Sequence, residues 1–228
     1  MTLEDLQKNI GIPFTNVNLL KLAFVHRSHL NESHEFTESN ERLEFLGDAV
    51  LSFVTSEYLY KTYPQFPEGT LTNIRSTLVK TKSLSQVAAA LHLGELLLLS
   101  RGEESSGGRS NESLLADCYE ALLGAIYLDA GIEAARKYVS ETLLVRTEDI
   151  IKTKSYVDFK SLLQEIVQEK TKVSPLYRVV KSEGPDHDKT FWVEVVSEEK
   201  VIGSGSGKSK QEAEQRAAEA ALEASGKI

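Results

Sequence analysis

The chain has 228 residues, 41% of them hydrophobic, and a formal net charge of -8, and this length accommodates one large domain or two small ones. No apolar run approaches the roughly 18 residues that cross a bilayer, and the N-terminus lacks a basic-then-apolar secretory pattern, so we expect a cytoplasmic protein with no membrane partner. The single cysteine, Cys118, excludes an internal disulfide and a multi-cysteine zinc site, and the acidic balance argues against a nucleic-acid partner unless positive charge is gathered locally.

Residues 1–150 are predicted to form an all-α domain. From Leu3 to about Arg146, amphipathic helical patterns follow one another and are interrupted by turn-forming segments. The periodic stretches include Leu71 to Leu91 and Ser113 to Leu128. Almost no alternating pattern is long enough to predict a strand.

Two of these helices carry acidic stripes. In the segment 40–48, Glu41, Glu44 and Asp48 fall within an arc of about 60° on a helix. Like charges at this spacing destabilise a helix, and no Lys or Arg stands four residues further on to offset them. Solvated helix faces are one interpretation, and a site for a divalent cation is the other.

A second acidic pair, Asp117 and Glu120, lies in the otherwise nearly uncharged stretch 113–128. Ligand sets made only of oxygen are typical of magnesium or manganese. Both acidic helices contain an interior glycine, Gly47 and Gly124, each of which costs about 1 kcal/mol relative to alanine. We infer that these glycines allow the two helix backbones to approach closely and bring the acidic faces together.

Phe45 lies close to the first acidic stripe and not on the apolar face of its helix. An aromatic side chain in this position needs cover. Either a neighbouring helix buries it in the core, or a second subunit contacts it.

Beyond residue 150 the pattern changes. The apolar periodicity lapses over the predicted linker 151–156, and residues 157–226 show the order helix, three strands, helix. The predicted elements are a helix around 159–167, strands at Leu176–Val180, Thr190–Val196 and Lys200–Ser204, and a helix at Lys210–Ala224. Helices segregated onto one face of a small antiparallel sheet make this an α+β domain.

The string Gly203 to Ser209 suggests a phosphate-binding P-loop, but the glycine required five residues before Gly207 is replaced by Ile202. We therefore expect no nucleotide cofactor. Ser209 to Glu212 instead predicts a capping box at the start of the last helix. Together with Lys208 and Lys210, this helix start predicts a local anion site.

The first region resembles the ribonuclease III family. The resemblance is carried by His26-Arg27-Ser28, by Asn40 to Leu51, by Pro67-Glu68-Gly69 leading to Ser76, and by Leu114 to Ala121, in the family's order. It implies the ribonuclease III fold and a homodimer that hydrolyses both strands of double-stranded RNA. The implied products have 5′-phosphate and 3′-hydroxyl ends, and the implied role is the processing of ribosomal, messenger and transfer RNA precursors.

Carried over residue by residue, the resemblance implies that Glu44, Asp117 and Glu120 bind Mg²⁺, for which Mn²⁺ can substitute. It further implies that Asp48 and Glu120 are essential to catalysis. Glu41 and Glu68 match further acidic positions of the family's cleavage cleft and are given a supporting role.

The second region, from about Tyr156 to Leu222, resembles a double-stranded RNA-binding domain. The resemblance implies minor-groove contacts by Gln164 and Glu165 and by His187, and contacts to the intervening phosphates by Lys208, Ser209, Lys210 and Gln211. Gln211 stands where many members carry lysine, and Asp186 and Asp188 flank His187. We therefore expect weaker and more salt-sensitive RNA binding.

Two other functions compete with this one. A non-catalytic RNA-binding protein with a decayed nuclease domain would have lost at least one metal carboxylate, whereas Glu44, Asp48, Asp117 and Glu120 are all present. A DNA nuclease is disfavoured because the C-terminal domain resembles one that recognises A-form geometry and 2′-hydroxyl groups.

Overall fold

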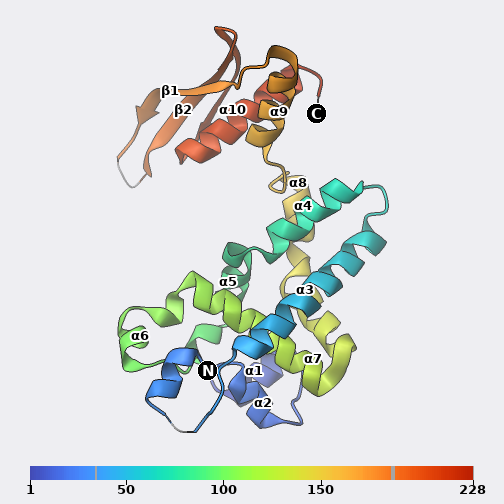
Figure 1. Cartoon of the computed structure of the whole chain (residues 1–228), viewed down its shortest axis with the longest axis vertical. Coiled ribbons are helices and arrows are strands. Elements are labelled where there is room, and N and C mark those ends of the chain that lie inside the picture. Colours follow the sequence, from blue (N-terminus) through green and yellow to red (C-terminus); the bar gives the residue numbers. More distant parts are fainter. Residues whose placement is uncertain (34, 186–187, 228) are drawn as a thin grey trace. The chain divides into compact units, whose positions relative to one another are not determined.

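The computed structural model describes residues 1–33, 35–185 and 188–227. The chain forms two compact units, Met1–Tyr156 and Val157–Ile228, which are shown in Figure 1. In its described residues the first unit is helical, with one isolated β-bridge between Val25 and Leu98. The second unit has two helices and a three-stranded antiparallel sheet. The predicted fold class, all-α followed by α+β, is confirmed.

The first unit is built from helices that follow one another along the chain. They are α1 (Leu3–Ile10), α2 (Val17–Leu22), α3 (Glu41–Thr62), α4 (Glu68–Val79), α5 (Thr81–Ala90), α6 (Arg101–Ser105), α7 (Glu112–Thr142) and α8 (Thr147–Lys152), with short 3-10 helices η1 (Arg27–Asn31), η2 (Leu93–Glu95), η3 (Gly108–Ser110) and η4 (Leu144–Arg146).

Helix α7 is the centre of the first unit. Between Leu115 and Ile126 its side chains are buried on nearly every side, and only Asp117 and Glu120 stay partly open to solvent. A helix that is apolar almost all round must be enclosed by other helices, and α3 and α5 provide most of that cover. The two carboxylates therefore lie at a gap in this cover.

Helices α3 and α7 cross with their backbones in direct contact. A Cβ atom added to Gly47 would collide with the carbonyl oxygen of Glu120, and one added to Gly124 would collide with the carbonyl oxygen of Leu43. Neither obstacle is a flexible side chain, so only glycine fits at either position. The inferred close approach of the two acidic helices is confirmed.

One predicted stretch is broken. The periodic segment 71–91 was predicted to be continuous, but α4 ends at Val79 and α5 begins at Thr81, because Lys80 has an extended backbone with ψ of 148°. The break lets α4 pack against α3 and α8 while α5 packs against α7. Similarly, the predicted linker 151–156 begins within α8, where Ile151 packs on the core of the first unit.

The second unit packs α9 (Phe159–Thr171) and α10 (Lys210–Ala224) on the sheet formed by β1 (Leu176–Glu183), β2 (Thr190–Ser197) and β3 (Lys200–Gly207), in the order β1-β2-β3. Val193 and Val195 of β2 are buried between sheet and helices, and Phe191 is partly buried with them.

The Gly-Ser repeat of β3 has a packing role. Added Cβ atoms at Gly203 and Gly205 would collide with the backbone of α10 at Ala217. The alternating glycines thus allow an alanine-rich helix to lie directly on the strand, and this explains a string that fails as a P-loop.

The helix crossing gives a stability prediction. Gly47→Ala places a methyl group against backbone that cannot rotate away, so we expect the free energy of unfolding to fall by about 3 kcal/mol or more. Gly69→Ala is the matched control, because nothing lies within 4 Å of its added Cβ in α4. Urea unfolding should show the control unchanged or slightly stabilised; equal effects of the two substitutions would contradict the crossing.

Candidate active site

Four carboxylates from two helices gather beside the glycine crossing. Glu44 and Asp48 lie one turn apart on α3, and Asp117 and Glu120 lie one turn apart on α7. Glu44, Asp117 and Glu120 are half-buried, whereas Asp48 is exposed. Because Gly47 contacts the backbone of Glu120 itself, the crossing sets how near the two pairs lie. We call Glu44, Asp48, Asp117 and Glu120 the carboxylate cluster.

The electrostatics link the four groups. Burial, followed by the charges of Asp48, Glu44 and Asp117, raises the pKa of Glu120 to about 8. Burial also raises the pKa of Glu44, to which Asp117, Glu41 and Asp48 add. The pKa of Asp117 is raised by burial, and the nearby His26 and Arg27 oppose that rise. The cluster thus holds more negative charge than its own surroundings compensate.

The donor set suits a hard divalent cation, since all four groups offer oxygen and only oxygen. The raised pKa of Glu120 adds to the fit, because positive charge placed among these carboxylates would remove their repulsion. Within the described ranges, no three His, Cys, Asp or Glu side chains already converge into a group that could hold a metal ion.

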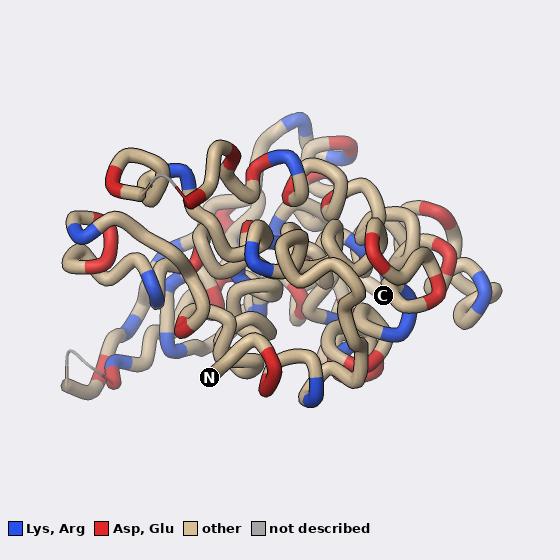
Figure 2. The backbone as a smooth tube through the Cα atoms, turned by 90° about the horizontal axis from the view of Figure 1, so that it is seen from below, with Lys and Arg blue, Asp and Glu red and all other residues tan. Residues whose placement is uncertain are grey.

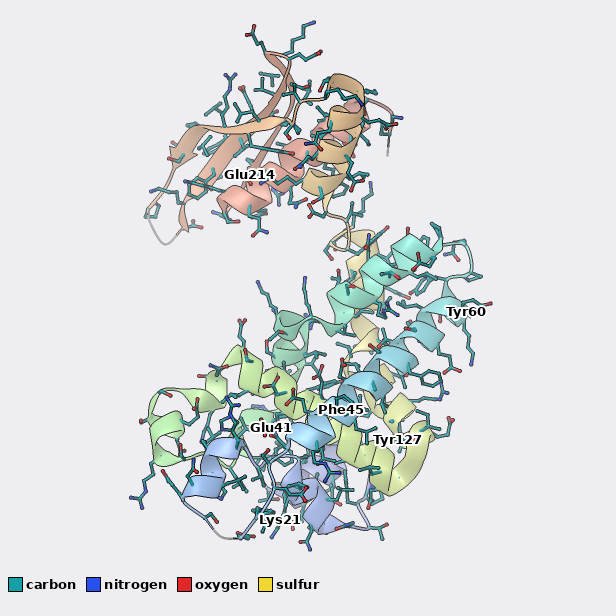
Figure 3. All side chains as sticks on the ribbon, viewed as in Figure 1. Lys21, Glu41, Phe45, Tyr60, Tyr127 and Glu214 are labelled. Atoms are coloured by element: carbon teal, nitrogen blue, oxygen red, sulfur yellow. The ribbon has the colours of Figure 1, made fainter. Side chains whose placement is uncertain are left out.

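A pocket of about 330 Å³ adjoins the cluster, and its lining includes Glu41, Glu44 and Asp117 together with His26 and Arg27. Arg27 Nη1 lies 3.6 Å from Glu41 Oε1, and the Ser39 hydroxyl donates a hydrogen bond to Glu41 Oε2 at 2.7 Å. Glu41 is thus engaged on both of its oxygens. Figure 3 shows Glu41 and Phe45 on the first turns of α3.

Glu68 lies elsewhere. It begins α4 and accepts a hydrogen bond from the Thr72 hydroxyl at 2.9 Å. Helix α3 continues for about five turns between Glu44 and Thr62, or about 27 Å, before the chain turns into α4 (Figure 1). The structure does not bring Glu68 to the carboxylate cluster of its own chain.

His26 and Arg27, which belong to the motif His26-Arg27-Ser28, lie on the wall of the acidic pocket. His26 Nδ1 lies 2.8 Å from the Ser28 hydroxyl, and this hydroxyl accepts a hydrogen bond from the Ser100 N–H at 3.0 Å. The network ties η1 to the start of α6 and holds His26 on the wall of the acidic pocket, beside Arg27. Apart from the motif, no local sequence pattern could have indicated this hydrogen-bond network, because Ser28 and Ser100 are far apart in sequence.

In the second unit, the predicted RNA contacts lie on exposed surfaces. Gln164 and Glu165 are exposed on α9, and Lys208, Ser209, Lys210 and Gln211 are exposed around the start of α10. His187 lies outside the described residues, as does its neighbour Asp186.

The capping box at the start of α10 is only half confirmed. The Ser209 hydroxyl accepts from the Glu212 N–H as predicted, but the Glu212 carboxylate accepts from the Lys208 N–H and not from that of Ser209. The Lys208 ammonium donates to Asp188 Oδ1 at 2.6 Å. One of the two lysines expected to meet phosphate is therefore already paired.

Comparison with known proteins gives two family matches. Residues 16–147 match the family described as Ribonuclease-III-like, and residues 159–224 match the double-stranded RNA binding motif. The chain is 48% identical over 221 residues to Ribonuclease 3 of Treponema denticola, covering 97% of this chain and 90% of the relative. It is 47% identical to Ribonuclease 3 of Enterococcus faecalis, covering 96% and 95%.

Among solved structures, the nuclease domain of ribonuclease III from Campylobacter jejuni is similar to this chain with a TM-score of 0.58 and 40% identity, covering 62% of this chain and 95% of that one. The published description of that structure concerns flexibility in a region involved in dimer formation. In the part of our chain that is described, no helix is long and apolar enough to cross a membrane.

The raised pKa of Glu120 predicts that folding stability depends on pH. Between its usual value of 4.5 and about 8, the folded protein keeps a proton that the unfolded chain has released, so folding stability falls as pH rises through this window. Glu120→Gln removes the charge. Without metal, we expect the variant to match the parent below pH 4.5 and to exceed it by about 2 kcal/mol above pH 8, allowing for solvent screening.

Unfolding by urea across this pH range, in the presence of EDTA, measures the difference. Glu141→Gln is the matched control, since Glu141 is an exposed carboxylate of α7 beyond the kink at Gly131. It should change the free energy of unfolding only slightly. An equally slight effect of Glu120→Gln above pH 8 would contradict the proposed strain in the carboxylate cluster.

Proposed function

The chain belongs to the ribonuclease III family, in the class with one nuclease domain and a C-terminal double-stranded RNA-binding domain, and we propose that it is a divalent-metal-dependent endonuclease that hydrolyses both strands of duplex RNA. The products carry 5′-phosphate and 3′-hydroxyl ends. The substrates are ribosomal RNA precursors and other structured transcripts of a bacterial cytoplasm.

The observation that carries this proposal is the carboxylate cluster at the glycine crossing, in a chain that also contains a double-stranded RNA binding motif. A decayed nuclease would have no reason to keep four carboxylates whose mutual repulsion destabilises the fold. The strained cluster therefore supports an active enzyme over a protein that only binds RNA.

Glu44, Asp117 and Glu120 would hold Mg²⁺, or Mn²⁺ in its place. When bound, the ion supplies positive charge that brings the pKa of a water nearer to neutral and offsets charge on the phosphate and the departing 3′ oxygen. Burial and the neighbouring carboxylates raise the pKa of Glu120 to about 8, so a bound cation would favour its charged, ligating form. Asp48, exposed at the edge of the cluster, orients the attacking water.

Arg27 gives the acidic pocket a positive group, and His26 lines the wall beside it. We assign them to holding the backbone of the cut strand, since a guanidinium presents paired N–H donors that suit phosphate oxygens. Glu41, engaged with Arg27 and Ser39, holds that guanidinium in place. A cleft role for Glu68 requires a second copy of the chain to supply it.

The cleavage assay uses end-labelled duplex RNA. With Mg²⁺ we expect cutting of both strands to products with 5′-phosphate ends, and with EDTA no cutting. Glu120→Gln should lower the rate by at least about 100-fold, because it removes a charged group from the reacting site, while the variant still binds the duplex in the presence of Ca²⁺.

Glu141→Gln again serves as the control and should cut at the parental rate. The same sequence as duplex DNA should remain intact. Cleavage of single strands alone, or cutting that persists undiminished in Glu120→Gln, would overturn the proposal.

A homodimer forms the second part of the proposal. Phe45 is 82% exposed, Phe53 53% and Tyr60 75%, and helical periodicity puts the three within an arc of about 80° on α3. The alternative that a neighbouring helix buries Phe45 is wrong for the single chain. Exposed aromatic side chains aligned on one face are typical of a protein interface, and two subunits would supply one cluster for each RNA strand.

Sedimentation velocity over a range of concentrations tests the dimer. Phe45→Ala should weaken association by about tenfold or more, because it removes an aromatic anchor. Val17→Ala, which truncates a 44% exposed side chain on α2, should leave association unchanged. A parent protein that stays monomeric at assay concentrations contradicts the dimer without affecting the assignment of the carboxylates.

A further inference from the structure

A second pocket of about 330 Å³ in the first unit is lined by residues that the proposed cleavage chemistry does not use. It lies where α4 gives way to α5 and where η4 leads into α8. Its cationic side chains are Lys80, Lys82 and Arg146, and its only acidic side chain is Asp149. Hydroxyl and amide side chains fill much of the remaining wall, among them Thr77, Ser83, Gln86, Thr153 and Ser155.

Arg146 is fixed in this wall before any ligand arrives. Its Nη1 donates to the Ser83 carbonyl oxygen at 3.0 Å and its Nη2 donates to the Gln86 side-chain oxygen. A guanidinium has five N–H donors in a rigid plane, so further donors remain for a ligand. Because the side chain is already half-buried and held, binding through it requires little additional ordering.

Lys80 and Lys82 are exposed and differ from Arg146 in having no side-chain partner in the described part of the chain. The pocket thus sets three positive groups against one negative group. Lys and Arg are otherwise interspersed with Asp and Glu along the chain (Figure 2), whose net charge is -8. A local excess of positive charge in such a chain selects an anion.

We propose that this pocket binds a backbone phosphate of duplex RNA away from the cut site, an inference that rests on the proposed function. A fixed guanidinium, two exposed ammonium groups and several hydroxyls match the tetrahedral oxygens of a phosphate. The carboxylate cluster of the same unit repels RNA, so a positive contact within that unit offsets the repulsion and holds the duplex against the nuclease domain.

The test compares Lys80→Ala/Lys82→Ala with Lys8→Ala/Lys21→Ala, which removes the same charge from the same unit outside the pocket. Duplex RNA binding is measured with Ca²⁺ in place of Mg²⁺ over a series of salt concentrations. We expect the pocket variant to bind about tenfold more weakly at low salt. The slope of its plot of log affinity against log salt concentration should be smaller in magnitude by about one to two.

Asp149→Asn should change the affinity for RNA in the opposite direction. It removes the single carboxylate from the pocket and should strengthen RNA binding. Circular dichroism establishes that each variant folds. A pocket variant that binds like its control, with an unchanged salt slope, overturns the inference while duplex cleavage by the parent still supports the proposed function.

Inorganic phosphate, titrated by calorimetry into the parent and the pocket variant, separates the two sources of the anion. If the heat of phosphate binding disappears in the pocket variant while RNA binding is unchanged, the pocket binds free phosphate and the RNA assignment is overturned. RNA binding that weakens only in the pocket variant supports it.

Discussion

The backbone contact between α3 and α7 is the constraint on which the rest of the first unit depends. Two helices that meet through glycine lie nearer to each other than two helices separated by side chains. At Gly47 and Gly124 this closeness brings four carboxylates from two sequence segments to one place. It also puts α7 at the centre of the core, where α3 and α5 cover it. The position of the cluster is therefore set by backbone, which relaxes far less than side chains do.

This arrangement stores electrostatic strain. Burial, followed by the charges of Asp48, Glu44 and Asp117, raises the pKa of Glu120 to about 8. The surrounding helices tolerate the strain because the core of α7 is otherwise apolar and well packed. Natural sites that bind cations commonly combine an unfavourable metal-free state with a stable scaffold.

The fold class and the helix crossing could be predicted from the sequence, because both depend on local sequence patterns. The period of the apolar residues predicted the all-α and α+β units, and the interior glycines at 47 and 124 predicted the close helix approach. The features that were missed depend on residues distant in sequence. The break at Lys80 follows from α4 and α5 packing on different helices. The pocket at Arg146 needs Ser83 and Gln86, and the absence of Glu68 from the cluster follows from the length of α3.

The ion pair between Lys208 and Asp188 would reduce the net free energy that the second unit gains when Lys208 contacts an RNA phosphate. A phosphate that reaches Lys208 replaces a carboxylate and not water, so only the difference between two ion pairs contributes to binding. An isolated anion gains little from such an exchange. A duplex that makes several contacts at once can supply the difference elsewhere. Asp188 would thus compete with RNA phosphate for the ammonium group of Lys208.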